Sequence, residues 1–129
     1  MNRMIAALML FALVAAPVFG QQNIEQQKIA YLIDSVATLQ AATFIRNGTE
    51  YDATHAADHM RLKLRFAGSH VKTAEDFITY CGTGSSISGT KYTIRFRDGR
   101  VVDSATFLQS KLAEYAMRHP GQTLVPPVY

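Results

Sequence analysis

The chain has 129 residues, of which 48% are hydrophobic and 18% are charged, and its formal net charge at pH 7 is +3. This length suits one modest domain. So small a positive excess gives no argument for nucleic-acid binding from charge alone.

The first twenty residues have the pattern of a secretory signal peptide. Arg3 supplies a positive start, an apolar run continues to Val14, and Gly20 ends the segment with a small residue. That run is too short for a permanent anchor, and no later run approaches the length of a membrane-spanning helix. We therefore expect residues 1–20 to direct export to the periplasm and to be removed.

The next segment predicts a helix followed by a β-hairpin. Asn23 is expected to cap the helix, whose apolar stripe consists of Ile29, Leu32, Ile33, Val36 and Leu39. Asn47-Gly48 is typical of a two-residue type I′ turn, because both residues tolerate positive φ. This turn places Phe44 opposite Tyr51.

A second helix is expected to begin after Asp52, which can cap it, and to end at Gly68. Its inner stripe consists of Ala53, Ala56, Ala57, Met60, Leu64 and Ala67. The sequence RLKLRF, residues 61–66, alternates polar and apolar residues and so also fits a strand. The cap and the preceding alanines favour the helix.

A short third helix is predicted from Thr73, as N-cap, to Gly82, with Asp76 at the third helical position. Cys81 lies within the apolar sequence FITYCG and is the only cysteine of the chain. A single cysteine excludes an internal disulfide, and we expect this thiol to be buried.

The last third of the chain predicts a second hairpin and a final helix. Asp98-Gly99 forms the turn, and Tyr92, Ile94 and Phe96 point inward. Ser104 opens the helix. Residues 21–118 would then form a single α+β domain, with about four helices packed on a small antiparallel sheet made from the two hairpins, and residues 119–129 an extended tail.

The sequence GTGSSISGTKY, residues 82–92, joins the third helix to the second hairpin. Gly84 and Gly89 have the spacing of a phosphate-binding loop, but Thr90-Lys91 replaces Lys-Ser/Thr and a helix precedes where a strand is needed. Ser88 and Lys91 have the spacing of an S-x-x-K motif, but they do not lie on a helix. We reject both interpretations and expect a polar connector that is suited to recognition.

His55 and His59 lie one helical turn apart with Asp58 beside them, a pattern similar to an inverted zincin motif. Aspartate in place of glutamate shortens the reach of the base, and His70 and Asp76 are the alternatives for a third ligand. We therefore expect His59 to hydrogen-bond locally and His55 to be solvated, and we expect no metal and no cofactor.

Four arginines of the two hairpins are expected to point outward: Arg46, Arg95, Arg97 and Arg100. Two roles fit this basic strip. It would meet an anionic envelope polymer or an acidic envelope protein, or it would keep the sheet edges soluble and unpaired.

Four motifs in one order, FIRNG, AADH-x-R-x-K, TAEDFI and SSISGTKY, resemble the YfeK-like family of small exported bacterial proteins, a domain of unknown function. The resemblance covers residues 24 to about 115. It implies a periplasmic domain, and it brings no activity, cofactor or catalytic residue.

Ser88-Gly89-x-x-Tyr92 is also similar to a loop of the periplasmic inhibitors of animal-type lysozyme, in which a serine and a basic residue approach the acidic cleft of the enzyme. Those inhibitors are β-barrels.

These features predict a non-enzymatic periplasmic binding or accessory protein that recognises its partner through residues 82–92 and the basic hairpin face. No set of residues supplies a nucleophile, a base and an oxyanion donor together. The residues expected to take part are Arg46, Asn47, His59, Lys63, Ser85, Ser86, Ser88, Lys91 and Tyr92. Two alternatives stay open: a small envelope hydrolase that pairs His59 with a loop serine, and an inhibitor-like protein that uses Ser88 and Tyr92.

Overall fold

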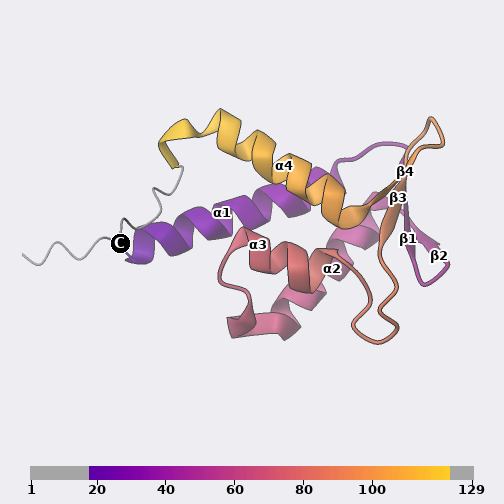
Figure 1. The fold of residues 1–129 in the computed structure, drawn as a ribbon, viewed down its shortest axis with the longest axis horizontal. Coiled ribbons are helices and arrows are strands. Elements are labelled where there is room, and N and C mark those ends of the chain that lie inside the picture. Colours follow the sequence, from indigo (N-terminus) through magenta and orange to yellow (C-terminus); the bar gives the residue numbers. More distant parts are fainter. Residues whose placement is uncertain (1–17, 123–129) are drawn as a thin grey trace, which may run out of the picture.

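The computed structural model describes residues 18–122; most of the predicted signal peptide and the end of the predicted tail lie outside this range. The described part has four α-helices and one four-stranded antiparallel sheet, which confirms the predicted α+β fold. The sheet lies at one end of helices α1 (Val18–Ala37) and α4 (Ser104–Arg118), which pack against each other (Figure 1). No helix within this range is long and apolar enough to cross a bilayer.

Helix α1 begins at Val18, so the expected cap at Asn23 is wrong. Asn23 is an exposed residue inside the helix. The two glutamines before it favour helix, and they let α1 extend past the position of the expected cap. Four members of the predicted apolar stripe lie on α1 and are buried: Ile29, Leu32, Ile33 and Val36. The fifth, Leu39, lies beyond the end of the helix, so its place on the stripe was wrong. The predicted cleavage point after Gly20 lies within α1.

The two predicted hairpins pair with each other to form the sheet, in the strand order β2-β1-β3-β4. The strands are β1 (Thr43–Arg46), β2 (Thr49–Tyr51), β3 (Thr93–Arg95) and β4 (Val101–Asp103). Asn47 and Gly48 have φ of 50° and 76°, as a type I′ turn requires. One row of side chains crosses all four strands: Tyr51, Phe44, Ile94 and Val102. Phe44 and Ile94 are buried, so this row lies on the inner face of the sheet.

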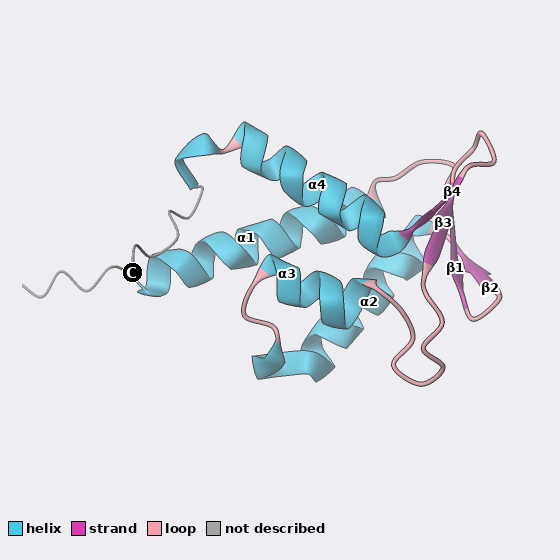
Figure 2. Ribbon diagram, in the orientation of Figure 1, coloured by secondary structure: helices cyan, strands magenta, loops and turns pink. Residues whose placement is uncertain are grey.

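Helix α2 (Ala53–Ala67) begins as predicted after Asp52, whose carboxylate accepts a hydrogen bond of 2.8 Å from the backbone N–H of His55. Residues 61–66 are helical, which resolves the ambiguity of the alternating sequence. Lys63 therefore follows His59 by one turn on the same side of the helix. Helix α2 contacts α1 and strand β1 (Figure 2), and its residues Ala57 and Met60 are buried.

Helix α3 (Ala74–Phe77) has the predicted cap at Thr73. The Thr73 hydroxyl accepts from the Asp76 N–H at 3.0 Å, and the Asp76 carboxylate accepts in return from the Thr73 N–H at 3.1 Å. The helix continues as one turn of π-helix, η2 (Ile78–Gly82). Cys81 is fully buried there, as predicted, and burial raises the pKa of its thiol, although the positive charge of Lys63 opposes this shift.

Gly82 packs directly against α4, where a Cβ atom would collide with the side chain of Leu108. A glycine is thus needed here for close approach, in addition to its expected role as a helix stop. Two 3-10 turns complete the described chain, η1 (Gly68–His70) after α2 and η3 (Pro120–Gln122) after α4.

Candidate functional site

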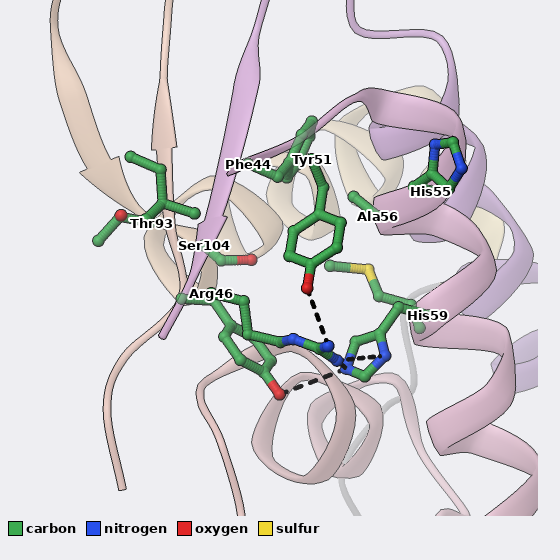
Figure 3. Close-up of a pocket in the computed structure, with 11 residues that line it drawn as sticks. Phe44, Arg46, Tyr51, His55, Ala56, His59, Thr93 and Ser104 are labelled. Carbon is green, nitrogen blue, oxygen red and sulfur yellow. Dashed lines mark hydrogen bonds between the residues drawn. The ribbon is translucent and has the colours of Figure 1, made fainter. Parts of the chain in front are cut away.

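A small pocket lies between α2 and the inner face of the sheet (Figure 3). Its volume is about 130 Å³. For comparison, an engineered cavity of about 150 Å³ holds a benzene molecule. Phe44 of β1 and Ala56 and Met60 of α2 give the pocket apolar walls, and the first residue of α4, Ser104, adds a hydroxyl.

Arg46 reaches from the end of β1 to α2 at this pocket. Its Nη1 atom lies 2.7 Å from Nδ1 and 2.8 Å from Nε2 of His59, and its Nη2 atom donates to the Tyr51 hydroxyl at 3.1 Å (Figure 3). A guanidinium only donates, and a neutral imidazole accepts at one nitrogen. The contact therefore requires a neutral His59 that accepts from Arg46.

Tyr92 and Lys63 continue this group of polar side chains. The Tyr92 hydroxyl lies 3.4 Å from His59 Nε2 and accepts from Lys63 Nζ at 3.2 Å. Lys63 Nζ also donates to the carbonyl of Gly84 at 3.0 Å. We call the five side chains of Arg46, Tyr51, His59, Lys63 and Tyr92 the basic cluster.

The basic cluster carries positive charge without an acidic partner. Within residues 18–122, neither Arg46 nor Lys63 forms an ion pair with a carboxylate, although both side chains are partly buried. Burial, the charge of Arg46 and the charge of Lys63 lower the pKa of His59, in that order of importance. The cluster therefore offers donors and positive charge to an anion.

The loop of residues 83–92 folds back on itself and touches neighbours of the cluster. Ser85 N–H donates to the Thr90 carbonyl at 2.9 Å, which closes the loop as a narrow turn. Ser88 Oγ donates to Asn47 Oδ1 at 2.6 Å and so attaches the loop to the β1–β2 turn. Figure 2 shows the loop at the same end of the sheet as that turn.

Residues 23–116 match the pattern of a protein family of unknown function, DUF5329. The chain belongs to the DUF5329 family. The uncharacterized protein YfeK of Salmonella typhimurium (strain LT2) is 33% identical over 81 residues, which cover 62% of this chain and 68% of that protein. The predicted likeness to the YfeK-like family is confirmed. No solved structure matches the chain.

The DUF5329 fold brings together four of the residues that the sequence singled out: Arg46, His59, Lys63 and Tyr92. The expectation that Arg46 points outward is wrong. Side chains two positions apart on a strand share a face, and Phe44 of β1 faces inward, so Arg46 does as well. His59 was expected to bond locally, but its partners come from β1 and from the residue just before β3.

The remaining predicted residues of this DUF5329 protein lie outside the basic cluster. Ser85 Oγ accepts from two N–H groups of its own loop, at 3.2 and 3.3 Å, and Ser86 is exposed. Lys91 Nζ lies 3.5 Å from an oxygen of Asp103. The hydrolase alternative requires a hydrogen bond between His59 and a loop serine. Among the described residues no such bond is present.

The inhibitor-like alternative gains no support from the fold. This alternative requires the Ser88 hydroxyl to contact a partner, but that hydroxyl donates a hydrogen bond to Asn47. The domain is also α+β, whereas those inhibitors are β-barrels. The alternative stays a prediction that depends on a short loop sequence.

A metal site at the two histidines would need further ligands. The described part of the chain holds no group of three or more histidine, cysteine, aspartate or glutamate side chains placed to bind an ion. His55 is exposed, as expected, and its Nδ1 lies 2.7 Å from an oxygen of Asp52. His59 faces Arg46 instead.

Sequence reasoning missed two residues of the site in this DUF5329 domain. Tyr51 was placed correctly opposite Phe44, but its hydroxyl was not connected with Arg46. A signal was present, because Arg46 and Tyr51 flank the same two-residue turn. Ser104 was taken as a helix opener, and nothing in its sequence context indicates that its side chain is buried in a pocket wall.

Proposed function

We propose that this protein is a non-enzymatic binding module that holds an anionic group at its basic cluster. One observation carries the proposal: within residues 18–122, Arg46 and Lys63 converge on His59 and Tyr92, and neither cation forms an ion pair with a carboxylate. Positive charges that are partly removed from water gain from a counter-ion, and a bound anion can supply it.

The donors of the cluster suit this role. Arg46 presents a planar fork that can hold a carboxylate or phosphate through two parallel hydrogen bonds. The hydroxyls of Tyr51 and Tyr92 lie beside it, and Lys63 adds a second positive charge. The loop of residues 83–92 contributes by holding Lys63 through the Gly84 carbonyl.

We further propose that the protein acts in the periplasm. The charged start, the short apolar run and the small residue at position 20 support export. Its partner would then be a component of the cell envelope.

The outer arginines are less available to such a partner than the sequence suggested, because Arg95 pairs with Glu50 and Arg100 with Asp98. An anionic group that enters the basic cluster is therefore a better candidate than a polymer that covers the whole sheet.

Thermal unfolding of the purified protein in sodium chloride, acetate or phosphate at equal ionic strength tests the proposal. Acetate or phosphate should raise the Tm above its value in chloride, because a ligand that binds only the native state stabilises it. Arg46→Gln should remove the increase. Arg97→Gln removes an exposed arginine that follows β3 and should keep it. An equal Tm in all three salts would refute anion binding.

A further inference from the structure

The basic cluster and the apolar pocket are parts of one site. Arg46, Tyr51, His59 and Tyr92 line the pocket and also form the cluster. The remaining wall is mostly carbon, with the Phe44 ring on the sheet side and Ala56 and Met60 on the side of α2. A ligand that fills the whole site therefore needs an anionic end and an apolar body.

Ser104 adds a third element to this site. The residue is 1% exposed, and its buried Oγ atom has no hydrogen-bond partner among the described residues. Ser104 lines the pocket, and its hydroxyl points toward the side on which Tyr51 lies (Figure 3). Buried polar groups in native proteins are nearly always paired, so a lone hydroxyl in a pocket wall indicates a place for a polar atom of a ligand.

We propose that this site binds a small aromatic monocarboxylate that carries a polar ring substituent. The carboxylate contacts Arg46 and the tyrosine hydroxyls, the ring lies between Phe44 and Met60, and the substituent meets Ser104. This inference rests on the proposed function and adds the class of ligand.

The size and the chemistry of the pocket support an aromatic ring. Its volume of about 130 Å³ is close to that of a cavity that holds one aromatic ring and is small for a long acyl chain. Aromatic side chains such as Phe44 and Tyr51 pack favourably on the edge or face of another ring, and a methionine sulfur also makes favourable contacts with rings. A single carboxylate is sufficient because Arg46 provides one fork.

The test is isothermal titration of the intact purified protein with benzoate, acetate, isovalerate and benzyl alcohol at constant ionic strength. Benzoate should bind with a Kd at least about tenfold lower than acetate, because the buried ring adds apolar contact. It should also bind more tightly than isovalerate, which lacks a ring, and than benzyl alcohol, which lacks the charge. One of the three monohydroxybenzoates should bind about 2- to 10-fold more tightly than benzoate, through Ser104.

Two variants separate the parts of the site. Ser104→Ala should remove the advantage of the hydroxybenzoate over benzoate and keep benzoate binding, and it should not lower the Tm because it deletes an unpaired hydroxyl. Ala56→Leu fills the pocket from α2. It should abolish the preference for benzoate over acetate while acetate still raises the Tm.

The outcomes distinguish this inference from the proposed function. Equal affinity for benzoate and acetate would overturn the aromatic ligand and leave anion binding at the cluster intact. Isovalerate binding as tightly as benzoate would show that any compact apolar body suffices, which also overturns it. Benzyl alcohol binding as tightly as benzoate would show that the charge adds nothing to binding in the pocket, which overturns the inference as well. No anion binding at all would refute both proposals.

Discussion

His59 lies between two cations, and this position predicts how stability depends on pH. Burial, Arg46 and Lys63 lower its native pKa below the ordinary value of 6.5, and the hydroxyls of Tyr51 and Tyr92 are the other polar groups of the cluster. The unfolded chain therefore binds the proton more readily than the native state. The free energy of unfolding should fall as the pH drops below about 6.5, and this loss should end below the native pKa.

Urea unfolding between about pH 5 and 8 measures this dependence. His59→Gln should flatten the decrease, because the titrating group is gone. His70→Gln, a change at an exposed histidine, should leave it intact. A slope that is unchanged in His59→Gln would show that other groups cause the pH dependence.

Gly82 predicts a steric effect at the scale of one atom. A Cβ atom there would collide with the Leu108 side chain, which is fully buried. We expect Gly82→Ala to lower the free energy of unfolding by about 1–3 kcal/mol, as overpacking does. Gly121 has no atom within 4 Å of such a Cβ, so Gly121→Ala is the matched control and should change stability little. Equal effects of the two changes in chemical denaturation would argue against the collision.

At the scale of elements, Asn47 has two roles that one substitution can separate. Its positive φ forms the β1–β2 turn, and its side chain accepts from Ser88 of the loop. Asn47→Gly keeps the turn, because glycine tolerates positive φ, but removes the acceptor. We expect faster amide exchange at residues 85–90 and unchanged protection of the β1–β2 hairpin. Ser88→Ala should have the same effect. Exchange at wild-type rates in both variants would mean that the loop is held by its own backbone bonds alone.

Local signals in the sequence predicted most of the elements. The Asn47-Gly48 turn and the cap of α2 each depend on residues that lie close together in the chain, so short motifs sufficed. The start of α1 was misjudged because a weak cap competes poorly with helix-favouring neighbours. The π-helical turn at Ile78–Gly82 was not predicted. The two hairpins were expected to form one sheet, but that they join through β1 and β3 was not predicted. Both depend on tertiary packing, which local motifs do not report.

At the scale of the whole molecule, the basic cluster exists because three segments of the chain meet. Arg46 lies on β1, His59 and Lys63 lie on α2, and Tyr92 precedes β3. The residue types could be selected from the sequence, since polar residues near apolar stripes and turns are few. That these residues lie together could not be predicted from the sequence, because it depends on which face of the sheet α2 covers. The buried position of Ser104 has the same origin.

Lys63 provides the sharpest test of whether the whole cluster serves binding or only stability. Lys63→Met keeps the length and helix propensity of the side chain but removes its charge. If the cluster is built for an anion, the free energy of unfolding should stay unchanged or rise by about 0.5–1 kcal/mol. The reason is that the change relieves the repulsion between Lys63 and Arg46, which is kept for binding. The pKa of His59 should then rise toward 6.5 in NMR titrations, and the Tm increase in acetate should shrink.

The matched control for this change is Lys91→Met, which removes an exposed lysine near Asp103 and should alter neither the His59 titration nor the response to acetate. A structural cluster would behave differently. In that case the bond from Lys63 to the Gly84 carbonyl would be the important contact, and its loss should destabilise the fold by more than about 1 kcal/mol while the acetate response persists. Such a result would assign Lys63 to the attachment of the loop and leave Arg46 as the one cation that could recognise an anion.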